Sequence, residues 1–420
     1  MYQKTTLDNG LRAITVTMPH THSVSICIFI GVGSRYEAEA KAGVSHFIEH
    51  LLFKGTLKRT TAKTISEAIE GVGGILNGGT GKESTLYWCK VAQSHFELAL
   101  DVLADMLLHA RFDPQDIEKE RQVITEEINR SNDSPAQRVD MLIDELLWPE
   151  HPLGRDIAGS KESVSAITRD AMLDYQQSQY HPNNTVVAIA GNIQHQQIVT
   201  AINQALGNWT NEQKSPGYSA YKEHLVQRMR IETKDTEQVH LCLALPGLSL
   251  FHPKRFTLDL LNTILGSGMG SRLFSEIRDK LGLAYNIHSY AEHFLDSGSL
   301  TISAGVESKN LSTVIKAILE QLVLLREIVP ESELSKAKEL SKGRLLLSLE
   351  DSRNVAGWVG GQEILTGRIL SIDQIVPIID AITTDELKQL AQELLVGSRL
   401  RLAVVGRVAE DKPLEKLLKL

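Results

Sequence analysis

The sequence repeats itself at an offset of about 215 residues, and this feature constrains the fold more than any other. The matched segments keep their order and spacing across two hundred residues. We therefore expect two similar domains in one chain rather than a solenoid of short repeats. The matched pairs are Ser25–Ile28 with His240–Leu243, Ala166–Asp170 with Ala381–Asp385, and Val187–Asn192 with Leu402–Arg407.

Each half begins with β-branched, apolar strands, continues with a helix, and ends with a last apolar strand. Because strands and helices alternate without a strict βαβ repeat, we predict an α+β fold of two homologous α/β-sandwich domains. The predicted domains are residues 1–210 and 223–420, joined by a polar linker at 211–222 that contains Ser215-Pro216-Gly217. The predicted strands are Leu11–Met18, Ser23–Val32, Thr185–Ala190, Met229–Thr233, Gln238–Leu245 and Leu400–Val405.

Composition excludes several function classes. The formal net charge of −8 argues against nucleic acid as a partner, because neutralising phosphates requires a basic surface. The longest apolar stretches, such as Val24–Val32, are too short to span a bilayer, so no membrane association is expected. The N-terminus resembles neither a signal nor a transit peptide. The cysteines, Cys27, Cys89 and Cys242, are few and far apart, so we expect a cytoplasmic, prokaryotic protein.

His46, Glu49 and His50 form a metal half-site with a general base. On a helix, His46 and His50 lie about 40° apart and Glu49 lies on the far flank of His46, which is the inverzincin pattern. A catalytic zinc needs a third protein ligand and an open position. The predicted helix Asp116–Arg130 carries two candidates, Glu120 and Glu127, which share a face but lie about 10 Å apart along the axis. One of them is a ligand and the other supports the site or faces the substrate.

The second half of the repeat lacks these ligands. If Gly55 is aligned with Gly266, the positions of His46, Glu49 and His50 are taken by Thr257, Leu260 and Leu261. If the histidines served packing alone, a duplicated fold would not need them in just one of its two copies. We therefore expect metal in the N-terminal domain only.

With 76 residues between His50 and Glu127, the sequence resembles the M16 (pitrilysin/insulinase) metallopeptidases over nearly its whole length. The resemblance implies one zinc per chain, held by His46, His50 and Glu127, with Glu49 as general base and Glu120 in a supporting role. The resemblance is also carried by Gly31–Glu37, His46–Thr56, Asn77, Thr80, Glu83 and Thr85.

The resemblance also implies where substrate binds. The segment Asn77-Gly78-Gly79-Thr80 corresponds to an edge strand to which substrate adds as a further strand. The family more usually has Ala and an aromatic or apolar residue at Gly78 and Gly79, which leaves specificity open, and a simple hairpin turn is the alternative. Arg278 and Tyr285 match a pair that contacts the substrate backbone and stabilises the oxyanion. They are otherwise ordinary residues of a helix and a strand.

The implied function is a zinc endopeptidase that cleaves peptides or unfolded segments inside a closed chamber. The two-domain length resembles the short branch that includes mitochondrial processing peptidase, so we expect a homodimer in which Arg278 and Tyr285 reach the zinc site of the opposite chain. Two alternatives remain open, which are a non-catalytic assembly subunit and a peptide-binding, chaperone-like chamber.

Overall fold

The structure is a computed structural model that describes residues 2–210, 217–408 and 414–420. Its contacts divide it into two compact units. Unit 1 comprises Met1–Ile128, Asp156–Ser219 and Leu346–Ser371, and unit 2 comprises Asn129–Arg155, Ala220–Leu345 and Ile372–Leu420. Of the predicted linker, residues 211–216 lie outside the described residues, and residues 217–222 form neither helix nor strand.

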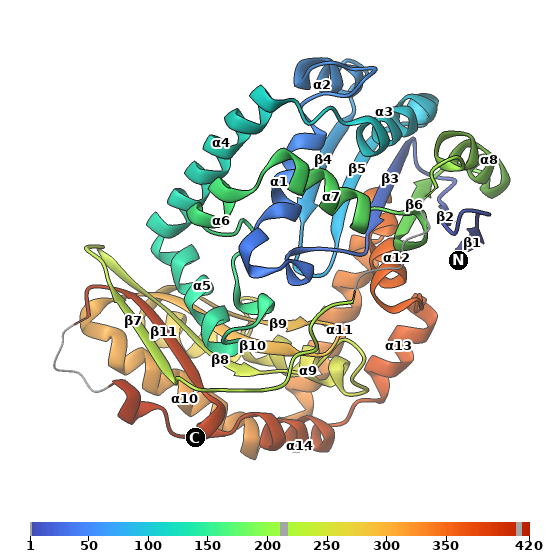
Figure 1. Ribbon diagram of the computed structural model, residues 1–420. Coiled ribbons are helices and arrows are strands. Elements are labelled where there is room, and N and C mark those ends of the chain that lie inside the picture. Colours follow the sequence, from blue (N-terminus) through green and yellow to red (C-terminus); the bar gives the residue numbers. More distant parts are fainter. Residues whose placement is uncertain (1, 211–216, 409–413) are drawn as a thin grey trace. The chain divides into compact units, whose positions relative to one another are not determined.

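Unit 1 contains a six-stranded mixed sheet in the order β1-β2-β6-β3-β5-β4 (Figure 1). The β2–β6 pair is parallel and the other pairs are antiparallel, and this mainly antiparallel sheet with its helices is the predicted α+β fold. Among the described residues, β4 has β5 as its single neighbour and therefore forms an edge. The strands are β1 (Gln3–Thr6), β2 (Arg12–Thr17), β3 (Ser23–Ile30), β4 (Ile75–Thr80), β5 (Thr85–Ala92) and β6 (Thr185–Gly191).

Helices cover both faces of this sheet. Alternate residues of β3 point to opposite sides: Val24, Ile26 and Ile28 join the core that includes α1 and α3. Cys27 and Phe29 instead contact the apolar side of α12. The helices of unit 1 are α1 (Val44–Leu52), α2 (Ala62–Glu70), α3 (Phe96–His109), α4 (Pro114–Asp133, in unit 1 up to Ile128), α6 (Lys161–Ala166), α7 (Arg169–Gln179), α8 (His195–Leu206) and α12 (Ser352–Thr366).

Unit 2 repeats this plan with a five-stranded mixed sheet in the order β7-β11-β8-β10-β9 (Figure 1). Its strands are β7 (Met229–Thr233), β8 (Gln238–Pro246), β9 (Ala284–His293), β10 (Gly298–Glu307) and β11 (Arg401–Gly406). Its helices are α5 (Pro135–Leu147), α9 (Arg255–Gly266), α10 (Leu311–Glu327), α11 (Glu331–Ser348, in unit 2 up to Leu345), α13 (Ile372–Ala381) and α14 (Thr384–Leu394). The repeated motif before α7 and α14 is an N-cap in both units, with Thr168 and Thr383 accepting hydrogen bonds from the first turn.

Two helices are exchanged between the sequence halves. α5 comes from the first half but packs on the sheet of unit 2, where it covers Cys242 and Ala403. α12 comes from the second half but covers the matching position, Cys27, on the sheet of unit 1. The compact units therefore cut across the predicted division into residues 1–210 and 223–420, because each half gives one helix to the other sheet.

Polar contacts fix α12 to unit 1. Glu363, whose side chain is almost fully buried, forms ion pairs with Lys4 (2.5 Å) and Arg12 (3.3 Å). At the other end of the helix, Asp351 pairs with Lys90 at 2.5 Å, and Ser352 is within hydrogen-bond distance of Ser25 at 2.9 Å. These polar contacts specify which sheet α12 covers. The apolar face of the helix alone would not specify it.

We predict that Glu363→Ala lowers the stability of unit 1 by about 1–3 kcal/mol, because Lys4 and Arg12 lose their buried partner. Thermal unfolding followed by circular dichroism measures the change. Glu350→Ala, at an exposed position just before α12, is the matched control and should unfold like the wild type. Equal midpoints for both variants would contradict the anchoring role.

Candidate metal centre and active site

The fold of α1 depends on its first turn and on one apolar face. Gly43 precedes the helix with a φ of +92°, a conformation that favours glycine. The Glu37 carboxylate accepts hydrogen bonds from the backbone N–H groups of Gly43 (2.7 Å) and Ser45 (2.8 Å), so it caps the helix. The apolar face is buried, whereas His46, Glu49 and His50 lie on the half-buried flank. The buried residues include Val44, Phe47, Ile48, Leu51 and Leu52.

His46, His50 and Glu127 come together from α1 and α4. The two Nε2 atoms are 3.3 Å apart, and Glu127 Oε2 lies 3.6 Å from His50 Nε2 and 3.8 Å from His46 Nε2. They are the one group of three or more His, Cys, Asp or Glu residues in the described part of the chain that is spaced to hold a metal ion. The sequence-predicted ligand set is thus brought together in unit 1.

This triangle fits zinc. Zinc–nitrogen bonds of about 2.0–2.1 Å at tetrahedral angles place neighbouring ligand atoms about 3.3–3.4 Å apart. The Nε2–Nε2 distance agrees with this spacing, and the carboxylate oxygen is a few tenths of an ångström farther away. His50 Nδ1 lies 3.0 Å from Glu120 Oε2, so Nδ1 donates to this carboxylate, and in the neutral ring Nε2 then carries the lone pair.

Burial keeps His46 in the form that can bind metal. Desolvation, followed by the neighbouring His50, lowers the pKa of His46 to about 4. His46 is therefore neutral at neutral pH, and its Nε2 can act as a ligand without first losing a proton.

Glu120 lies behind His50 rather than at the centre of the triangle. Its carboxylate contacts His50 Nδ1 through Oε2 and Lys54 Nζ through Oε1, at 3.0 and 2.8 Å. Burial opposes ionisation, but the hydrogen bonds from His50 and Lys54 outweigh it and lower the pKa of Glu120 below its usual value. The structure thus separates the two glutamates that helical spacing alone had left equivalent.

Glu49 is held against the edge strand. Thr80, the last residue of β4, donates a hydrogen bond from its hydroxyl to Glu49 Oε2 at 2.7 Å. Desolvation raises the pKa of Glu49, although the bond from Thr80 works against this rise. A raised pKa brings a carboxylate closer to the range in which it both accepts and returns protons near neutral pH.

The segment Asn77–Thr80 is an edge strand and not only a turn. A Cβ at Gly78 would lie 3.0 Å from the Phe53 ring and 3.2 Å from Glu49 Oε1, so an alanine at this position would require these side chains to shift by a few tenths of an ångström. Gly79 has open space around the position of a Cβ. The Asn77 side chain accepts a hydrogen bond from the Gly78 N–H at 2.8 Å. Substrate pairing along this edge stays a prediction.

Arg278 and Tyr285 meet in unit 2. Arg278 lies on a π-helical segment, Phe274–Lys280, and Tyr285 is the second residue of β9. The Arg278 guanidinium lies 4.6 Å from the centre of the Phe274 ring and 5.0 Å from that of Tyr285. Tyr285 is 78% exposed, which is unusual for a tyrosine and leaves its ring and hydroxyl open to contacts. Their role at the substrate stays a prediction.

Sequence reasoning missed three contributions to the site. Glu37, within the segment that carried the family resemblance, caps α1, and Lys54 pairs with Glu120. Thr80 was assigned to the substrate strand, whereas its hydroxyl bonds to Glu49. Lys54 follows His50 by four residues, which is the spacing of neighbours on a helix and could have suggested the shared glutamate.

Comparisons with known proteins agree with this geometry. Residues 12–161 match the family model described as Insulinase (Peptidase family M16), and residues 166–341 match that of the Peptidase M16 inactive domain. An uncharacterized zinc protease of Bacillus subtilis is 36% identical over 395 residues, which is 94% of this chain and 96% of the relative. An uncharacterized zinc protease of Mycobacterium leprae is 37% identical over 423 residues, 99% of this chain and 94% of the relative.

Solved structures show the same fold. The crystal structure of a protease from Helicobacter pylori aligns with a TM-score of 0.91 at 22% identity, covering 97% of this chain and 99% of that one. An M16-like structure from Alicyclobacillus acidocaldarius aligns with a TM-score of 0.85 at 20% identity, covering 97% and 98%. In the part of the chain that the structure describes, no helix has the length and apolar character to cross a membrane.

The matching family models and relatives show that the chain belongs to the M16 peptidase family and is of its short, two-domain type.

Proposed function

We propose that this protein is a zinc-dependent endopeptidase. One observation supports this proposal above all others: His46, His50 and Glu127 form a triangle of zinc spacing beside a glutamate that is held by a hydrogen bond. When bound, zinc would supply a water of lowered pKa and polarise the scissile carbonyl. His46, His50 and Glu127 would hold one ion per chain.

The chain's own residues would manage the proton. Glu49 accepts a proton from the attacking water and delivers it to the leaving amine. Thr80 keeps the Glu49 carboxylate in one orientation through its hydrogen bond. Glu120 keeps the proton of His50 on Nδ1, so that Nε2 stays available.

Peptides or unfolded segments are the proposed substrates. The edge of β4 ends at Thr80, beside Glu49, so a substrate strand paired with Asn77–Thr80 would bring its backbone next to the general base. Strand pairing engages the backbone and requires an extended segment, which a folded protein does not offer. Arg278 and Tyr285 would contact the substrate backbone and stabilise the oxyanion.

We further propose a cytoplasmic homodimer. The sparse, buried and unpaired cysteines are typical of a reducing compartment. The dimer is proposed because the chain has the length of the short, two-domain type, and sharing of Arg278 and Tyr285 between chains is the arrangement that the family resemblance favours.

Two other functions make different predictions. A non-catalytic assembly subunit would not need the intact set of His46, Glu49, His50 and Glu127. The family description of an inactive domain applies to residues 166–341, which contain none of these four. A peptide-binding chamber would bind peptides whether or not Glu49 can accept a proton, and only turnover separates it from a peptidase.

The first prediction from the proposed function concerns turnover. We expect the zinc-loaded protein to cleave an unstructured, quenched peptide library, and Glu49→Gln to lower the rate by about 10²–10⁴-fold, because it cannot accept the proton. Chelation should abolish cleavage and zinc should restore it. Mass spectrometry of the products gives the cleavage preference. Cleavage that survives in Glu49→Gln would contradict the assigned base, and no cleavage with one zinc bound would favour the peptide-binding chamber.

The second prediction concerns Thr80. Thr80→Val removes the hydroxyl bond to Glu49 and should lower kcat by about tenfold, the effect of one hydrogen bond. Because that bond stabilises the charged carboxylate, its loss raises the pKa of Glu49 further, and the acid limb of the kcat/KM profile should move to higher pH. Thr80→Ser keeps the hydroxyl and should behave like the wild type. An unchanged kcat and acid limb in Thr80→Val would refute this role.

The third prediction tests the shared dimer site. Glu49→Gln and Arg278→Ala should each be nearly inactive alone. If the pair acts on the opposite chain, mixed dimers retain one site free of both changes, so an equal mixture should recover about one quarter of wild-type activity. Activity is measured after subunit exchange, confirmed by native mass spectrometry. No recovery in exchanged dimers would show that the sites are not shared.

A further inference from the structure

Glu120 is held at both carboxylate oxygens. His50 Nδ1 contacts Oε2 and Lys54 Nζ contacts Oε1, and the Glu120 side chain is nearly buried. Lys54 is 33% exposed at its side chain, so its charge is partly removed from water where it meets the carboxylate. A buried carboxylate with a donor on each oxygen has one favoured orientation, whereas a carboxylate with one donor can rotate about the remaining contact.

The orientation matters because α4 presents two glutamates to the same histidine. Glu127 faces His50 Nε2, and Glu120 faces His50 Nδ1, on the other side of the ring. Glu120 favours metal binding through His50 Nε2, because it accepts the hydrogen bond that keeps the ring proton on Nδ1. A cation on the second oxygen of Glu120 therefore helps to decide which ring nitrogen of His50 is the ligand and which glutamate remains at the triangle.

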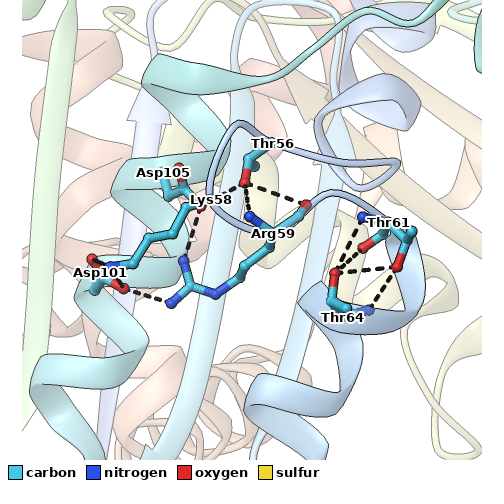
Figure 2. Close-up of polar contacts among 7 residues, drawn as sticks. All are labelled: Thr56, Lys58, Arg59, Thr61, Thr64, Asp101 and Asp105. Carbon is cyan, nitrogen blue, oxygen red and sulfur yellow. Dashed lines mark hydrogen bonds and ion pairs between the residues drawn. The ribbon is translucent and has the colours of Figure 1, made fainter.

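The backbone that carries Lys54 is itself fixed. Lys54 follows Phe53, the C-cap residue of α1, and its N–H donates to Leu51 O at 3.0 Å. The next residues are tied to α3: the buried Thr56 hydroxyl donates to Asp105 at 2.6 Å, and Arg59 reaches Asp105 at 2.9 Å and Asp101 at 2.5 Å. Figure 2 shows Arg59 bridging the two aspartates beside Thr56. Lys54 is thus placed between a helix end and an anchored loop.

We propose that Lys54 is a positioning residue of the metal centre, which holds Glu120 so that His50 binds through Nε2 and Glu127 remains the third ligand. This inference rests on the proposed zinc site, and it assigns Lys54 no contact with substrate or metal. Lys54 acts through Glu120, so its effect on zinc affinity should disappear when the Glu120 carboxylate is removed.

The chain provides a matched control. Lys58 belongs to the same loop, is 60% exposed at its side chain, and pairs with Asp101 at 2.6 Å rather than with Glu120. Figure 2 shows Lys58 extended toward Asp101. Lys54→Met and Lys58→Met each remove one lysine charge from this loop and keep a linear side chain, but only the first removes a contact to Glu120.

Zinc affinity, measured by competition with a chromogenic chelator, is the main readout, and the Co²⁺ absorption spectrum reports on the ligand set. We expect Lys54→Met to weaken zinc binding by about 10–100-fold and to change the Co²⁺ spectrum. Lys54→Arg should restore most of the affinity, and Lys58→Met should match the wild type. Circular dichroism melting of all variants checks that they are folded.

A double-mutant cycle separates positioning from a general effect of charge. In a Glu120→Gln background, Lys54→Met should change zinc affinity by less than about threefold, since its partner is already altered. Wild-type affinity and spectrum in Lys54→Met, or an equal loss in both backgrounds, would overturn the proposal. If the wild-type protein binds zinc but cleaves no peptide, the peptidase assignment is wrong. The role of Lys54 is then still tested by the zinc affinities of the variants.

Discussion

The site depends on a helix that is buried along one face only. α1 places Phe47, Ile48 and Leu51 in the core of unit 1, and this packing fixes the rotation of the helix about its axis. With the rotation fixed, His46, Glu49 and His50 must lie on the half-buried flank. The proposed zinc chemistry needs partial burial, because partial burial keeps His46 neutral and raises the pKa of Glu49 while leaving room for a ligand. Complete burial would close the site, and full exposure would leave both groups near their ordinary pKa values.

Features that depend on local sequence were predictable. The hydrophobic pattern predicted β2, β3, β6, β7, β8 and β11 to within a few residues, and the repeated segments that contain Thr168 and Thr383 begin a helix in each unit. The exchange of α5 and α12 was not predictable in this way. Both helices have apolar faces that fit a sheet, and the periodicity of a helix does not state which sheet it covers. That choice is made by partners distant in sequence, such as Glu363 with Lys4 and Arg12.

The same division between local and distant information applies to the site. The spacing within α1 identified His46, Glu49 and His50, because helical geometry fixes their relative directions. Spacing along α4 showed that Glu120 and Glu127 share a face, but the family resemblance was needed to assign the ligand. In the structure, Glu127 joins the triangle and Glu120 stays with His50 Nδ1 and Lys54. Thr80, more than thirty residues from Glu49, could be linked to it only by the folded sheet.

The twin domain shows why a duplicated fold keeps one centre. On α9, the positions that align with His46, Glu49 and His50 are Thr257, Leu260 and Leu261, which are all buried. α9 packs against β9 and α14, and this face serves the core of unit 2. A histidine placed there would be an imidazole in apolar surroundings with no open side for substrate, and burying it without partners is costly. The asymmetry is therefore set by packing as well as by the missing ligands, so restoring the three residues alone would not create a second active centre.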